Sequence, residues 1–158
     1  GNFLPSQILI SGRRAPQLAN TDDPLHELPD AKFALAVIRR YNGIPRVILE
    51  NAELLRIFLP ILRGDMRLIE TYAYQPEAPL PVPIHAMGGD ADLRVPAADL
   101  QAWQAQSAVP ATVQRFAGDH FYLQPLQQEV IGAIVQRMES QPQMQGAAAR
   151  ESGVKDHG

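Results

Sequence analysis

The hydrophobic pattern of this chain combines short apolar runs with longer stripes of helical spacing. Three short runs, at residues 7–11, 83–87 and 112–116, are each followed within two residues by glycine. Runs of this length that end at turn residues are typical of buried strands in a parallel sheet. Apolar residues recur with helical spacing in most of the remaining segments. We expect helices over residues 31–41, 45–50, 52–72 and 96–107, and a last helix that opens at Pro125.

The order of these elements is strand, helical insertion, strand, helix, strand, helix. Strands that alternate with helices indicate an α/β protein with a parallel sheet and helices on both faces. Three strands are few for this design, and the first strand would have an open edge. We therefore expect part of a domain over residues 1–138, with lid helices at about 30–74, a disordered tail over 139–158, and further strands on polypeptide that precedes Gly1.

Composition narrows the classes of function. The sequence has a net charge of −3 and no cysteine, which excludes disulfides, thiolate catalysis and thiolate metal sites. The sequence has no stripe or run of basic residues that would indicate binding to nucleic acid or to a membrane surface. No apolar stretch reaches the length of a transmembrane helix. The four histidines lack metal-ligand spacing, so no metal is expected. These features fit a cytoplasmic protein.

Two polar loops follow the second and third predicted strands, at the sheet edge where open α/β proteins place their active sites. The first loop carries Asp90 and Asp92, and the second carries Asp119 and His120. A carboxylate after one strand and a histidine after the next can meet, and the carboxylate then holds the imidazole in the tautomer that a general base requires. The residues alone leave open which aspartate pairs with His120.

A nucleophile is harder to find. In α/β-hydrolases the triad runs Ser, Asp, His along the chain, and the serine lies in a Gly-x-Ser-x-Gly turn. That pattern does not occur in this sequence, although Ser11 ends the first predicted strand. We therefore expect no nucleophile among these residues and no activity from this chain by itself. The serines are Ser6, Ser11, Ser107, Ser140 and Ser152.

Several segments resemble one enzyme family. Ser11–Pro16 is similar to the strand-and-loop signature of type II thioesterases from nonribosomal peptide and polyketide pathways. His26–Asp30 and Phe58–Asp65 resemble the start and the long helix of that family's lid, and the loops of Asp92 and His120 resemble its catalytic loops. The resemblance implies the C-terminal portion of an α/β-hydrolase whose nucleophile-bearing half lies outside the sequence.

The resemblance also implies a reaction. Such enzymes hydrolyse acyl thioesters on the phosphopantetheine arm of acyl or peptidyl carrier proteins, without a cofactor, in editing or release during antibiotic biosynthesis. Asp92 and His120 would complete the triad, and Arg13 and Arg14 would contact the phosphopantetheine phosphate or the carrier protein. The lid residues expected at the substrate are Leu55, Phe58, Leu59 and Leu62.

Other functions remain compatible with the sequence. The chain could bind a carrier protein or a partner hydrolase without turnover, because it has no Gly-x-Ser-x-Gly turn. It could also belong to a split enzyme whose serine lies on a second chain, or to another α/β-hydrolase such as an esterase. The paired carboxylate and histidine favour an enzyme, since a pure binding protein has no chemical need for both.

Overall fold

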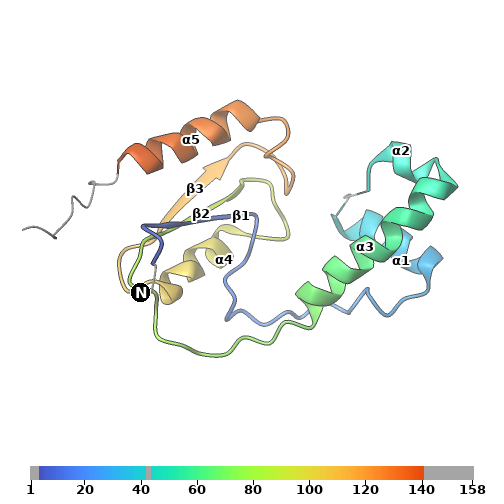
Figure 1. Ribbon diagram of the computed structural model, residues 1–158, viewed down its shortest axis with the longest axis horizontal. Helices are drawn as coiled ribbons and strands as arrows, with labels where there is room; N and C mark the ends of the chain where they lie inside the picture. The colour runs from blue at the N-terminus through green and yellow to red at the C-terminus, as the bar shows by residue number, and fades with distance from the viewer. Residues whose placement is uncertain (1–3, 42–43, 141–158) are drawn as a thin grey trace, which may run out of the picture. The chain divides into compact units, whose positions relative to one another are not determined.

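The computed structural model describes residues 4–41 and 44–140, so most of the expected tail lies outside the described residues. The chain divides into two compact units, the first ending at Tyr122 and the second beginning at Leu123. The first unit contains a sheet with a helical lid, and the described part of the second contains the helix α5 (Figure 1).

The sheet consists of β1 (Ile8–Ser11), β2 (Ile84–Gly89) and β3 (Thr112–Phe116), all parallel and in that order. The three predicted strands are thereby confirmed. In register, Ile8 lies opposite Ile84 and His85 opposite Thr112. Because parallel strands end at the same edge of a sheet, the loops that follow all three strands begin side by side.

One face of the sheet is covered by α4 (Ala97–Gln101) and the 3₁₀ helix η1 (Ala102–Gln106). Leu100 is completely buried against Ala86 and Val95. The sequence predicted a single helix here, but its second half is 3₁₀. The Gln104 side chain donates to the carbonyl oxygens of Ser107 and Val109, and such local side-chain bonds compete with regular helix.

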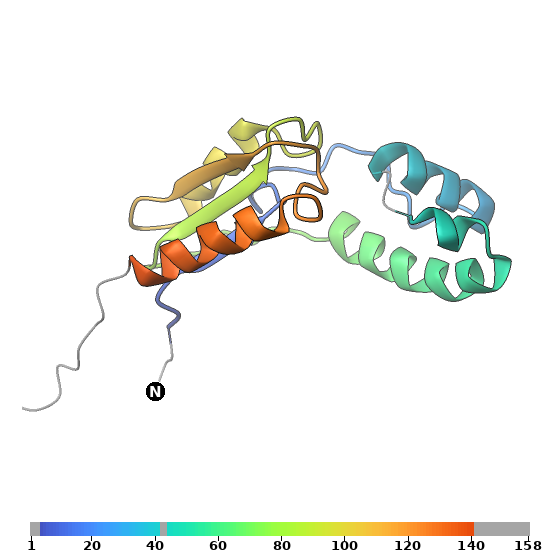
Figure 2. The ribbon, with the colours of Figure 1, turned by 90° about the horizontal axis from the view of Figure 1, so that it is seen from above.

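The lid is inserted between β1 and β2 and consists of α1 (Asp30–Tyr41), α2 (Arg46–Leu49) and α3 (Ala52–Glu70) (Figures 1 and 2). Asn51 caps α3, since its side chain accepts from the N–H groups of Glu53 and Leu54. The three helices share an apolar core of their own. Its buried members are Leu25, Phe33, Ala34, Val37, Ile44, Leu59 and Met66.

In the second unit, α5 (Gln127–Glu139) begins two residues later than predicted. The expected start at Pro125 was wrong, because the backbone of Leu126 is not helical, with φ −110° and ψ 25°. Over the described ranges, no helix has the length and apolar character needed to cross a membrane.

A buried carboxylate joins the two ends of the lid. Glu70, the last residue of α3, has a side chain only 3% exposed. Its Oε1 accepts from Leu25 N at 2.9 Å, and its Oε2 accepts from His26 N at 3.0 Å and bonds His26 Nδ1 at 2.6 Å. Burial acts to raise the pKa of Glu70, but the hydrogen bonds from His26 and Leu25 outweigh it and hold this pKa below its ordinary value of 4.5.

The lowered pKa of Glu70 predicts how stability depends on pH. The ionised carboxylate stabilises the fold above pH 4.5, and this contribution is lost as the pH falls through the lower folded-state pKa. We expect Glu70→Gln to lower the free energy of unfolding by about 2 kcal/mol at neutral pH, and by less in strong acid. Urea unfolding of both proteins at about pH 7 and about pH 3 measures the two differences.

The matched control is Glu50→Gln, which removes an exposed carboxylate paired with Arg46. This change should leave the free energy of unfolding nearly the same at either pH, because exposed ion pairs contribute little. Equal effects of Glu70→Gln in neutral and acidic solution would contradict the assigned role of the Glu70 carboxylate.

Candidate active site

The loops after β2 and β3 bring Asp92 and His120 together. The Oδ2 atom of Asp92 lies 2.8 Å from Nδ1 of His120. The carboxylate side chain is fully buried, whereas the imidazole is 30% exposed. This bond occupies Nδ1 and leaves Nε2 of the imidazole free to accept a proton, which is the arrangement of the acid and base in a hydrolase triad.

The second oxygen of the Asp92 carboxylate is also occupied. Oδ1 accepts from the backbone N–H of Arg94 at 2.8 Å and of Val95 at 3.1 Å. Because a buried carboxylate needs hydrogen-bond donors at both oxygens, these contacts hold the group in one orientation. The Asp92 carboxylate is therefore fixed by hydrogen bonds at both of its oxygens.

The structure distinguishes the three aspartates that the residues alone left as alternatives, and of which the family resemblance favoured Asp92. Asp90 accepts from Gly118 N at 2.9 Å and so ties the two loops together. Asp119 accepts from Phe121 N at 2.8 Å within its own loop. Of the three carboxylates, the one bonded to His120 is that of Asp92.

Two glycines at strand ends allow the histidine loop to pack closely. A Cβ atom at Gly89 would lie 2.3 Å from the carbonyl oxygen of Asp119 and 2.4 Å from that of Gly118. Gly12 has φ +58°, and a Cβ there would contact Cε1 of His120 at 3.5 Å. The ends of β1 and β2 thus provide the surface on which the imidazole loop lies.

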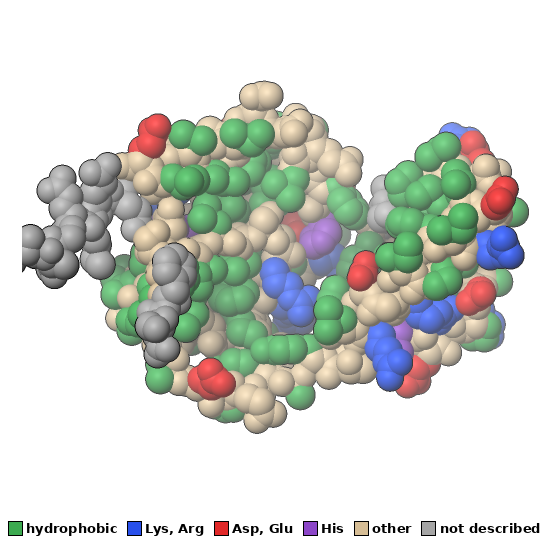
Figure 3. All heavy atoms as spheres, viewed as in Figure 1, with side chains coloured by type: hydrophobic (Ala, Val, Ile, Leu, Met, Phe, Trp, Pro, Cys, Tyr) green, Lys and Arg blue, Asp and Glu red, His purple; other side chains and the backbone are tan. Residues whose placement is uncertain are grey.

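His120 opens into a cavity of about 740 Å³ between the sheet edge and the lid. This volume lies within the range of small-molecule sites. Figure 3 shows a hollow with a histidine and basic side chains near it. The lid contributes an apolar wall, and the strand ends and the segment after β1 contribute a more polar one. The apolar lid residues are Val37, Leu62, Met66 and Ile69.

The predicted lid contacts divide between the cavity and the lid core. Leu62 lines the cavity, whereas Leu59 is buried in the lid core, where Leu55 and Phe58 pack against it. Met66 and Ile69 also line the cavity and were not among the lid residues predicted from the sequence. Their signal was present, because these two residues follow Leu62 at helical spacing of four and seven.

Arg13 and Arg14 both line the cavity. Arg14 forms an ion pair with Asp99 at 3.1 Å. The Arg13 side chain has no ion-pair partner among the described residues, and its carbonyl oxygen accepts from Trp103 Nε1 at 2.8 Å. Arg13 is therefore the more available cation for an anionic ligand.

Ser11 lies close to the site but is engaged elsewhere. Its Oγ is 2.7 Å from the phenolic oxygen of Tyr122, which is completely buried. Burial raises the pKa of Tyr122 above its ordinary value, and the charge of Asp92 raises this pKa further. The hydrogen bond with Ser11 lowers the pKa of Tyr122 but does not cancel the rise. Ser107 donates to the carbonyl oxygen of Val82. Neither hydroxyl is hydrogen-bonded to His120.

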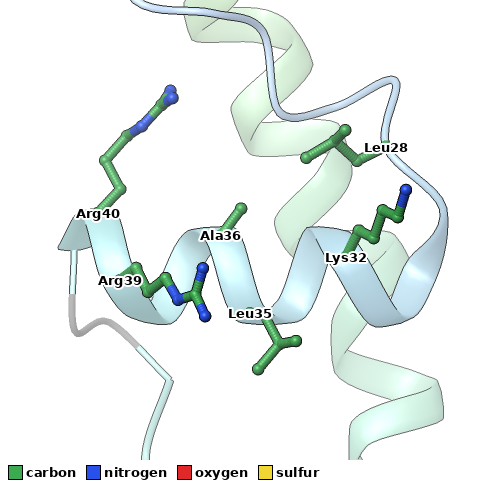
Figure 4. A pocket seen from close by; sticks show the side chains of 6 residues that line it. All are labelled: Leu28, Lys32, Leu35, Ala36, Arg39 and Arg40. Atoms are coloured by element: carbon green, nitrogen blue, oxygen red, sulfur yellow. The ribbon is translucent and has the colours of Figure 1, made fainter.

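A second hollow, of about 510 Å³, lies on α1 (Figure 4). It offers no acid–base pair, because its lining residues are apolar or basic. These residues are Leu28, Lys32, Leu35, Ala36, Arg39 and Arg40. Within residues 4–41 and 44–140, no group of three or more potential metal ligands comes together.

Known proteins resemble this chain over most of its length. The thioesterase PikA5 of Streptomyces venezuelae is 39% identical over 130 residues, which are 82% of this chain and 46% of that protein. The structure of ClbQ from the colibactin NRPS/PKS pathway matches 89% of this chain and 59% of its own, with a TM-score of 0.81 and 35% identity. The type II thioesterase BorB from the borrelidin cluster matches with a TM-score of 0.72 and 36% identity, over 84% of this chain and 54% of its own.

The chain thus spans about half the length of the relatives it matches. These matches confirm the predicted α/β-hydrolase fold and the resemblance to type II thioesterases. The family model for the thioesterase domain matches residues 4–140. The chain therefore belongs to the thioesterase family.

Proposed function

We propose that this chain supplies the aspartate and the histidine of the catalytic triad of a serine thioesterase. This enzyme hydrolyses acyl groups from the phosphopantetheine arm of carrier proteins. The observation that carries this proposal is the 2.8 Å bond between Asp92 and His120 at the edge of a cavity beneath a lid. The relatives support the pathway, since ClbQ comes from an NRPS/PKS pathway and BorB is a type II thioesterase.

In the proposed reaction, Nε2 of His120 takes the proton of a serine hydroxyl as its oxygen attacks the thioester carbonyl. The carbon–sulfur bond then breaks, and the imidazolium returns the proton to the leaving thiolate. Water, activated by the same imidazole, hydrolyses the acyl-enzyme. Asp92 holds the imidazole and stabilises its charged form. A serine in a Gly-x-Ser-x-Gly turn and the oxyanion-hole donors beside it would have to come from further polypeptide, because that turn does not occur in this sequence.

The cavity walls suggest how a thioester would lie. The apolar wall with Leu62 and Met66 would receive the acyl group, because it offers few polar partners. Arg13, which also lines the cavity, would meet the phosphate of the phosphopantetheine arm, whereas Arg14 is paired with Asp99. The partner is an acyl or peptidyl carrier protein, and the reaction takes place in the cytoplasm.

A serine-directed fluorophosphonate tests where the nucleophile lies. We expect no stoichiometric labelling of this chain alone, because the serine that lines the cavity, Ser11, bonds the Tyr122 hydroxyl and has no hydrogen bond to His120. A complete enzyme that adds a Gly-x-Ser-x-Gly turn should be labelled on that serine, and labelling should require His120. Stoichiometric labelling of the isolated chain would overturn this assignment.

Substrate hydrolysis separates the thioesterase from the other functions. The complete enzyme should release acyl groups from an acylated carrier protein faster than from a simple acyl ester, which distinguishes it from an esterase. Binding of the carrier protein without release would favour a non-catalytic role. Sequencing the DNA directly before the Gly1 codon shows whether the serine turn is encoded in the same reading frame.

A further inference from the structure

Arg94 contacts both the buried acid and the segment that precedes the lid. Its backbone N–H donates to Asp92 Oδ1 at 2.8 Å, beside the carboxylate that holds His120. Its side chain extends away from this loop, and the guanidinium forms an ion pair with Asp22. Asp22 belongs to residues 12–29, which join β1 to α1 and are called the leading segment.

The same guanidinium lies over the ring of Tyr41, the last residue of α1. The Cζ atom of Arg94 is 5.4 Å from the ring centroid, within the range of a cation–π contact. The Tyr41 ring in turn lies 6.5 Å from the ring of His120, centroid to centroid. Arg94, Tyr41, Asp22 and His120 all line the cavity. One side chain therefore joins the acid loop, the leading segment and the lid helix beside the imidazole.

The position of Arg94 is not that of an ordinary surface cation. Its Nε is buried and has no acceptor among the described residues. A buried donor without a partner disfavours this placement of the side chain, so the contacts with Asp22 and Tyr41 have to offset that cost. A solvated surface pair would leave the guanidinium nitrogens in water.

We propose that Arg94 is a positioning residue that holds the leading segment and the end of α1 over the pair of Asp92 and His120. By keeping Tyr41 beside the imidazole, it limits the access of water to the hydrogen bond between His120 and Asp92. Electrostatic interactions strengthen when water is excluded from them. The positioning concerns this chain alone, whereas its importance for turnover rests on the proposed function.

Hydrogen exchange of this chain tests the positioning. Arg94→Ala should speed amide exchange in the leading segment and in residues 118–122 by roughly tenfold, because the ion pair and the cation–π contact are lost together. Asp22→Asn should act mainly on the leading segment. Arg94→Lys keeps the positive charge but loses the planar guanidinium group. Its amide exchange rates should therefore lie between those of Arg94→Ala and those of the unsubstituted chain. Arg46→Ala, which removes an exposed pair with Glu50 in α2, is the control and should change neither segment.

Proton NMR gives a signature that a merely structural role would not change. The Nδ1 proton of His120, bonded to Asp92, should give a downfield resonance in the original chain and in Arg46→Ala. In Arg94→Ala it should broaden through exchange with water, and Arg94→Lys should restore part of the signal.

The proposal fails if Arg94→Ala matches Arg46→Ala in exchange and in the His120 resonance. It also fails if the leading segment loosens while residues 118–122 and that resonance stay unchanged. If Arg94→Ala does not fold, Arg94→Lys and Asp22→Asn carry the comparison. No substrate enters these measurements, so their outcome is independent of whether the complete enzyme hydrolyses thioesters.

Discussion

Asp92→Asn is expected to lower kcat of the complete enzyme by about four orders of magnitude. An asparagine amide can donate to Nδ1 of His120, which places the imidazole proton on Nε2. A protonated Nε2 cannot take the proton of the serine, so the base is lost although the geometry is kept. Single-turnover hydrolysis of an acylated carrier protein measures the chemical step apart from product release.

Asp90→Asn is the matched control for this change. The amide oxygen of an asparagine can still accept from Gly118 N, so the bond between the two loops survives. Only a small loss of kcat is expected. In the isolated chain, ¹⁵N NMR should place the neutral imidazole proton of His120 on Nδ1, and on Nε2 after Asp92→Asn. Equal losses of kcat in the two variants would refute the assignment of the acid.

Gly89→Ala is expected to destabilise the fold by about 3 kcal/mol. The new methyl group would lie 2.3 Å from the carbonyl oxygen of Asp119 and 2.4 Å from that of Gly118, and both obstacles are backbone atoms. Relief of this overlap requires the loop that carries His120 to move away from β2. We therefore expect the bond between His120 and Asp92 to weaken at the same time, which urea unfolding and the His120 NMR signals would report together.

Gly64→Ala is the matched glycine substitution, and it is expected to stabilise the fold. Gly64 lies inside α3, and a Cβ there would meet no other group within 4 Å. Because alanine favours helix over glycine, this change should raise the free energy of unfolding by about 0.5–1 kcal/mol. If Gly89→Ala did not lower the free energy of unfolding, the His120 loop would not lie as close to the end of β2 in solution as it does in the structure.

The elements themselves were predictable because their signals are local. The apolar runs at β1, β2 and β3 depend on neighbouring residues, and the structure has these strands where the sequence indicated. The predictions were wrong at the ends of two helices. The single helix expected over 96–107 ends in a 3₁₀ turn, and α5 starts after Pro125, because backbone geometry at a helix end depends on contacts that a periodic pattern does not encode.

The residues that line the cavity were likewise only partly predictable from the sequence. The sequence placed Leu55, Phe58, Leu59 and Leu62 on one lid helix, but it did not tell which of these side chains face the lid core and which face the cavity. Leu59 is buried in that core and Leu62 lines the cavity, together with Met66. The difference depends on how α1 packs against α3, and that packing involves residues distant in sequence.

The sequence by itself determined the order of strands and helices, the fold class, and the two loops from which a carboxylate and a histidine could meet. These follow from hydrophobic period and from the rule that parallel strands end at one edge. The residues alone left three aspartates open and the family resemblance favoured Asp92, but only the tertiary structure shows its carboxylate bonded to His120 and shows Arg94 reaching Asp22. These contacts join residues 28 and 72 positions apart, and their geometry arises only when the loops pack on the sheet edge.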